Sequence, residues 1–115
     1  MPEHEASRRA EKRVEVCWSV DCRSEETFLF AQITNVSALG LFVRTDLPLP
    51  VGTPVRLRFA PDGDGSFEFA GEVAWVNADV RHSRNPGMGV RFVGIGAEDR
   101  ERLVEAIHTI AYVRP

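Results

Sequence analysis

Hydrophobic and polar residues alternate along most of the chain from Val14 onward. In the first run every second residue from 14 to 20 is hydrophobic, with Glu15, Cys17 and Ser19 between them. Successive side chains of a strand point to opposite faces, so this pattern predicts a half-buried strand. The same period returns in five further segments, which we also predict as strands: 27–34, 41–45, 55–59, 67–75 and 88–92.

Residues typical of turns and loops separate these segments, around 21–26, 48–54, 61–66 and 77–87. Short strands with a turn signal about every dozen residues are typical of a sandwich or a barrel. In the strand 67–75 the alternation places Trp75 on the same inward face as Phe67, Phe69, Gly71 and Val73.

The period changes after Gly96. Glu98 and Asp99 stand where the N-terminus of a helix favours negative charge. Apolar residues then recur at helical spacing, at positions 103, 104, 107, 110 and 111. We therefore predict an all-β domain of six antiparallel strands with one C-terminal α-helix, about 97–112, whose apolar stripe covers an open end of the β-structure.

Composition agrees with one globular domain. The chain has 115 residues, 43% hydrophobic and 27% charged, which is too short for two independent domains or a large multi-domain enzyme. No stretch approaches the roughly 18 apolar residues of a membrane span, so we expect no membrane insertion. Residues 1–7 carry two acids where a signal peptide would be basic and then apolar, so we expect a cytoplasmic protein.

The net charge of −3 is unevenly distributed. Residues 8–13 hold four basic side chains and one acid, whereas 14–115 are net negative. We expect residues 1–12 to form a flexible basic arm and residues 13–113 to form the folded domain. A net negative domain argues against a nucleic-acid platform, because counterion release needs a broad cationic face. It leaves room for a small anionic ligand.

The remaining candidate chemistry is weak. Cys17 and Cys22 fall on opposite faces of the first strand, so we expect no disulfide between them. The three histidines are scattered, which disfavours zinc. Asp62 opens a segment similar to a calcium loop, but position 6 of that loop would be Phe67 and position 12 Val73. Residues 79–83 lack a nucleophile elbow. We therefore expect no metal, no cofactor and no enzymatic activity.

The basic arm contains the first of two motifs, an Arg-x-x-x-Arg spacing formed by Arg9 and Arg13. Two guanidiniums four residues apart can close on opposite sides of a compact anion, and each offers a planar fork to phosphate oxygens or to a guanine O6/N7 edge. The alternative is a solvated N-terminal tail.

The second motif, Asn35-x-Ser37-x-x-Gly40, lies between the predicted second and third strands. Its structural interpretation is a turn in which Asn35 and Ser37 cap their own backbone and Gly40 supplies a positive φ. Such a turn also presents backbone N–H groups and side-chain donors to an anion.

In this order and spacing the two motifs resemble those of the PilZ domain family, receptors for the bacterial second messenger cyclic di-GMP. The segment from Gly89 to Phe92 resembles the late strand of that family, and the resemblance runs from about Arg8 to Val113. It implies that the strands close into a six-stranded antiparallel, split-barrel-like PilZ-type β-barrel with the C-terminal helix.

The resemblance also implies a ligand and its contacts. Arg9 and Arg13 would engage guanine Hoogsteen edges and phosphates, and Asn35, Ser37 and Gly40 would hold the second side of cyclic di-GMP. In the family an arginine directly before the Arg-x-x-x-Arg segment tends to accompany two mutually intercalated ligand molecules. Arg8 occupies that position, so the resemblance implies an intercalated pair; the alternative is a solvated charge on the tail.

Two functions follow as hypotheses. The first is a stand-alone receptor that binds cyclic di-GMP and relays the signal to a downstream effector protein in motility, biofilm or surface-behaviour regulation. The second is a PilZ-like protein–protein interaction adaptor that does not bind the nucleotide. The receptor is favoured because all five motif positions are present, and an adaptor would be expected to lose at least one of them.

Overall fold

The structure is a computed structural model that describes residues 13–61, 66–77 and 85–113. The predicted basic arm, residues 1–12, lies outside the described residues, as do residues 62–65, 78–84 and 114–115. The described strands are β1 (Val14–Arg23), β2 (Phe28–Val36), β3 (Gly40–Arg44), β4 (Pro54–Phe59), β5 (Phe67–Asn77) and β6 (Gly87–Phe92).

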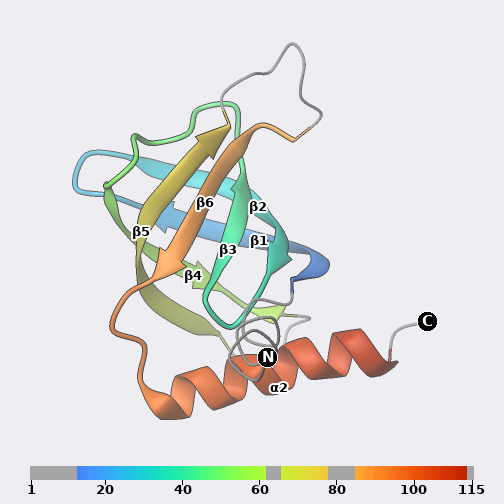
Figure 1. Cartoon of the computed structure of the whole chain (residues 1–115). Coiled ribbons are helices and arrows are strands. Elements are labelled where there is room, and N and C mark those ends of the chain that lie inside the picture. Colours follow the sequence, from blue (N-terminus) through green and yellow to red (C-terminus); the bar gives the residue numbers. More distant parts are fainter. Residues whose placement is uncertain (1–12, 62–65, 78–84, 114–115) are drawn as a thin grey trace, which may run out of the picture.

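The strands close into one antiparallel barrel in the order β1-β2-β3-β6-β5-β4, with β4 returning to pair with β1 (Figure 1). Five of the six neighbour contacts run along most of a strand, whereas β1 meets β4 only from Val20 to Arg23. All six predicted strands are therefore confirmed, and so is the closed barrel that the family resemblance implied.

Alternation along the strands fills the barrel with apolar side chains. On β4, for example, Val55, Leu57 and Phe59 are buried while Arg56 and Arg58 are exposed. Phe59 lies 5.6 Å from Phe67, measured between ring centroids, in a stacked arrangement. Full burial of a large apolar side chain contributes about 1.5–3 kcal/mol. The core therefore supplies the main stabilisation of the fold.

The C-terminal helix α2 (Ala97–Val113) lies across one end of the barrel (Figure 1). Leu103 and Ile107 are buried and belong to the barrel core. The guanidinium carbon of Arg102 lies 4.6 Å from the centroid of the Phe67 ring, a cation–π contact at the rim. The prediction of a helix that covers an open end is confirmed. In the described part of the chain no helix is long and apolar enough to cross a membrane.

Trp75 does not follow the predicted alternation. The register of β5 against β6 shifts between Val73 and Trp75, because Val73 pairs with Val90 and Trp75 pairs with the next residue, Gly89. Ala74 is thus the extra residue of a β-bulge, which reverses the faces of the residues after it. Val73 is fully buried, whereas Trp75 is 46% exposed on the outer surface of the barrel. The prediction of an inward-facing Trp75 was wrong.

The two cysteines lie on opposite faces of β1, as predicted. Cys17 is exposed, Cys22 is buried, and both are free thiols. Burial raises the pKa of the Cys22 thiol to about 11, because desolvation penalises the thiolate. Cys22 therefore behaves as a small apolar core residue.

Candidate functional site

The first motif reaches the second through a direct hydrogen bond. Arg13 directly precedes β1, and the pairing of β1 with β2 sets Glu15 opposite Asn35. From this position Nη1 of Arg13 donates to Oδ1 of Asn35 at 2.8 Å, across 22 residues of sequence. The bond is exposed to solvent, so both side chains are accessible to a ligand.

Asn35 lies within β2 and not in the turn, which corrects the prediction that it caps its own backbone. The register against β3 shifts between Ile33 and Asn35, so Thr34 is an extra residue in β2. This bulge turns Asn35 to the outer face, where it lies opposite Phe42 of β3. Bulges of this kind re-aim a side chain, and here the amide is aimed at Arg13.

Ser37 forms the turn as predicted. Its hydroxyl accepts a hydrogen bond from the backbone N–H of Leu39 at 3.2 Å and donates to the carbonyl of Gly40 at 3.3 Å. The backbone N–H of Ser37 also donates to that carbonyl, at 2.8 Å. Because Ser37 is only 2% exposed, its side chain shapes the turn from the inside.

Gly40 is required for a different reason from the predicted one. It begins β3 with extended backbone, and it is not among the described glycines with positive φ, which are Gly52, Gly87 and Gly94. A Cβ added at Gly40 would overlap the backbone carbonyl oxygen of Val90. The glycine therefore permits close approach of β3 to β6, which holds the turn against the barrel. The Leu39 carbonyl strengthens this by accepting from the Phe92 N–H at 2.9 Å.

A row of outward-facing residues runs across the barrel from Asn35. Cross-strand pairing sets Asn35 opposite Phe42, Phe42 opposite Gly89, and Gly89 opposite Trp75. The rings of Phe42 and Trp75 lie 5.2 Å apart between centroids with their planes tilted by 32°. The site therefore borders an aromatic surface, which the sequence alone did not reveal because the bulge at Ala74 has no sequence signature.

The charge around this surface is mixed. Arg44 follows Phe42 by two residues on the outer face of β3, and it is exposed. It makes no salt bridge with the described part of the chain. Arg91, opposite Gly40, pairs with Glu72 at 3.3 Å. Arg13 and Arg44 thus place two guanidiniums on the side of the barrel that carries the motif.

Arg8 and Arg9 lie outside the described residues, so the Arg-x-x-x-Arg spacing is represented in the structure by Arg13 alone. Of the six residues expected to contact a ligand, the structure brings Arg13 and Asn35 into contact, and it sets Ser37 and Gly40 in the adjoining turn.

The structure gives no support to the other candidate sites that the sequence suggested, in the part of the chain that it describes. In the described ranges no group of three or more His, Cys, Asp and Glu side chains could hold a metal ion. The residues 79–83 and the acidic loop after Pro61 fall outside those ranges. An open cleft of about 480 Å³ lies beside β1 and β4, where the two strands diverge, and none of the described motif residues, 13, 35, 37 and 40, lines it. It is lined by Cys17, Trp18, Ser19, Asp21, Arg58, Phe59, Ala60 and Ser66.

The structure is thus a closed antiparallel barrel with a helix across one end, and its surface brings an arginine and a polar turn together. The sequence model of the PilZ domain matches residues 7–108, so the chain belongs to the PilZ domain family. PilZ domains are regulatory receptor domains whose ligand is cyclic di-GMP.

Solved structures give the same fold. The inhibitor of motility MotI/DgrA of Bacillus subtilis superposes with a TM-score of 0.75 at 20% identity, over 90% of this chain and 50% of that one. This chain thus spans half the length of the Bacillus protein. The PilZ domain of CeSA from a cellulose-synthesising bacterium superposes with a TM-score of 0.66 at 14% identity, over 89% of this chain and 100% of that domain. No curated protein matches the chain.

Proposed function

We propose that this chain is a receptor that binds cyclic di-GMP through Arg8, Arg9, Arg13, Asn35, Ser37 and Gly40. The observation that carries the proposal is the hydrogen bond from Arg13 to Asn35, which joins the two family motifs into one site. Cyclic di-GMP offers two phosphates and two guanine bases, and the planar donors of arginine suit both groups.

The motif residues divide the work. Arg13 and Asn35 are accessible and bind the ligand directly, with Arg9 on the opposite side of the anion. Ser37 and Gly40 are buried, and they hold the backbone of the turn in the form that the ligand meets. Backbone N–H groups in such a turn add fixed donors for an oxyanion.

We further propose that two intercalated cyclic di-GMP molecules bind to each domain. A stacked pair concentrates four phosphate charges, and the guanidinium of Arg8 would offset part of their repulsion. The ligand would hold Arg8 and Arg9 together with Arg13, and this change in the basic arm would carry the signal to a downstream effector protein. We propose that the receptor acts in the cytoplasm and that the effector regulates motility, biofilm formation or another surface behaviour. The motility inhibitor among the structural neighbours supports this output.

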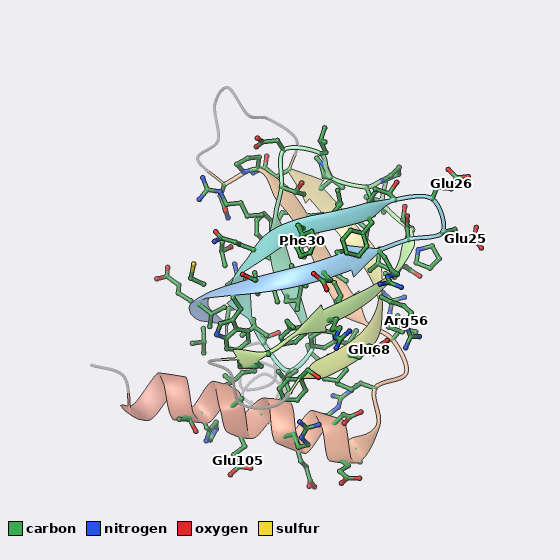
Figure 2. All side chains as sticks on the ribbon, turned by 180° about the vertical axis from the view of Figure 1, so that it is seen from behind. Glu25, Glu26, Phe30, Arg56, Glu68 and Glu105 are labelled. Atoms are coloured by element: carbon green, nitrogen blue, oxygen red, sulfur yellow. The ribbon has the colours of Figure 1, made fainter. Side chains whose placement is uncertain are left out.

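A PilZ-like adaptor that acts through protein contacts without nucleotide is the second candidate. It is favoured by an exposed aromatic pair on the outer face of β2, where Phe28 is 48% and Phe30 79% exposed. Their rings meet edge to face at 5.1 Å, and Figure 2 shows Phe30 on the open face of the strand. Exposed aromatic side chains are enriched at protein interfaces.

Amide shift mapping by NMR distinguishes the two functions. Stepwise addition of cyclic di-GMP to the labelled protein should move the amide signals of Arg13 and of residues 35–40, and leave those around Phe30 and on α2 in place. Cyclic di-AMP, which lacks the guanine O6 acceptor, is the matched control ligand. An unchanged spectrum at saturating cyclic di-GMP would contradict the receptor and leave the adaptor.

A further inference from the structure

Two contacting aromatic rings stand open on the outer surface of β2. Phe28 and Phe30 are two residues apart and therefore share one face of the strand. Phe30 is 79% exposed, more than any other large hydrophobic side chain in the described part of the chain. Figure 2 shows Phe30 on this surface, away from α2, which lies across one end of the barrel. A single exposed apolar side chain is ordinary, whereas adjoining exposed aromatic rings are typical of a protein interface.

The strand beside this pair carries one charge of each sign. Cross-strand pairing of β1 with β2 sets Arg23 opposite Phe28 and Asp21 opposite Phe30. The guanidinium carbon of Arg23 lies 5.4 Å from the centroid of the Phe28 ring. We call these four residues the aromatic face. It consists of two neighbouring rows, of which one joins an aromatic ring to a base and the other joins an aromatic ring to an acid.

Both charges of the aromatic face are left without a salt bridge inside the described part of the chain. On β4 the residue opposite Arg23 is Arg56, which pairs with Glu68, and the residue opposite Asp21 is Arg58. Like charges directly opposite each other on a sheet are destabilising. An acid from a second molecule would therefore stabilise Arg23.

The order of these residues makes the aromatic face complementary to itself. A two-fold axis that crosses the strands between the two rows reverses the strand direction and exchanges the rows. It sets Phe28 of one molecule against Phe30 of the other, and Arg23 against Asp21, with each contact made twice. Isologous dimers need this kind of self-complementary surface. A partner segment of a single charge would be attracted by one row and repelled by the other.

We propose that the aromatic face is the interface of a homodimer, in which the two barrels pack β2 against β2 in antiparallel orientation. The inference goes beyond the proposed function and does not rest on nucleotide binding. Asn35 lies roughly 15 Å along β2 from Phe30, so the candidate ligand site remains open in the dimer. An interface limited to two strands of each barrel is small, and the dimer should therefore be reversible.

The test is sedimentation equilibrium without nucleotide, in a reducing buffer because Cys17 is exposed. Between about 5 and 500 μM protein, the average mass of the parent should rise from that of one chain toward that of two. Phe30→Ser should raise the dimer dissociation constant roughly 30-fold or more, because the interface contains this side chain twice.

Val93→Ser is the matched control. Val93 is 42% exposed and directly follows β6, which lies opposite β1 in the ring of strands. Its removal should leave the dissociation constant unchanged, and thermal melts should show both variants folded. A parent that stays monomeric throughout this range would overturn the inference and leave the aromatic face to a different protein. A parent dimer that Phe30→Ser does not weaken would overturn it as well.

Exchange of charge between two variants tests the antiparallel arrangement itself. In Arg23→Asp both charged contacts of the dimer set acid against acid, and in Asp21→Arg both set base against base. Each variant alone should therefore dimerise more weakly than the parent. An equimolar mixture should dimerise more strongly than either variant, because two acids of one chain then face two bases of the other. A mixture that associates no better than the separate variants would overturn the proposed interface.

Discussion

Replacing Arg13 by alanine separates the contribution of this residue to folding from its contribution to binding. In the free protein Arg13 donates a hydrogen bond to Asn35 at 2.8 Å, and this bond is exposed to water. An exposed bond of this kind contributes no more than about 1 kcal/mol, because solvent replaces the lost partner. Arg13 also precedes the first strand, so Arg13→Ala should unfold at nearly the parent's urea midpoint.

The effect on binding should be larger. A guanidinium that donates two hydrogen bonds to a guanine edge contributes about 1–3 kcal/mol. Loss of that contact raises the dissociation constant for cyclic di-GMP roughly 5- to 150-fold. Asn35→Ala should weaken binding as well, and the double variant should lose less than the two single losses combined, because the side chains share one hydrogen bond.

Arg56→Ala is the matched control for this experiment. It removes the same charge from an exposed arginine on β4, where Arg56 pairs with Glu68 at 3.3 Å. Figure 2 shows these two side chains next to each other on the outside of the barrel. In calorimetric titrations of the parent, Arg13→Ala and Arg56→Ala, the dissociation constant of Arg56→Ala for cyclic di-GMP should equal that of the parent. Parent-like affinity in Arg13→Ala would refute the assignment of Arg13 to the site. An equal loss of affinity in Arg56→Ala would mean that the loss in Arg13→Ala reflects the change in net charge alone.

Three other predictions concern the turn, the stoichiometry and the thiols. Ser37→Ala should lower the free energy of unfolding by about 1–2 kcal/mol in urea titrations, because the Leu39 N–H and the Gly40 carbonyl each lose a partner; unchanged stability would contradict the turn. The parent should bind about two ligand molecules and Arg8→Leu about one, and a parent ratio of one at saturation would refute the intercalated pair. A thiol reagent at pH 8 should modify Cys17 rapidly and Cys22 only on unfolding, and rapid modification of both thiols would contradict the burial of Cys22. The free energy of unfolding should fall as the pH rises from 9.0 toward 11, because in that range the Cys22 thiol ionises in the unfolded chain but not in the folded one.

The fold was largely predictable because the spacing of apolar residues along the chain differs between strands and helices. Alternating apolar residues give the six strands, and the change to helical spacing gives α2, which is one residue longer than expected. Errors at the ends are small for the same reason: β2 runs two residues past the predicted Thr34, to Val36. Residues 35 and 36 were assigned to the turn because the asparagine, serine and glycine of the second motif are residue types typical of turns.

The faces of residues near bulges were not predictable. One extra residue in a strand reverses inside and outside, and neither Thr34 nor Ala74 differs from an ordinary strand residue. Asn35 was therefore placed in a turn and Trp75 in the core, whereas both lie on the outer surface. The pairing of Phe42 with Trp75 depends on the register of three strands, which no local pattern encodes.

Gly40 shows a second limit. Glycine in a motif between strands suggests positive φ, but the same residue type also serves close packing, and only the distance to Val90 distinguishes the two. The structure joins Arg13 of the first motif to Asn35 of the second, and the proposed division between ligand contact and turn support rests on the burial of Ser37, which the sequence does not show.

The most direct measurement of the central claim is calorimetric titration of the unmodified protein with cyclic di-GMP, at ligand concentrations far above the protein concentration. The receptor proposal predicts saturable heat with a ligand-to-protein ratio near two, and no saturable heat with cyclic di-AMP under the same conditions. The absence of saturable heat with cyclic di-GMP, from protein whose thermal melt shows it folded, would contradict the proposal.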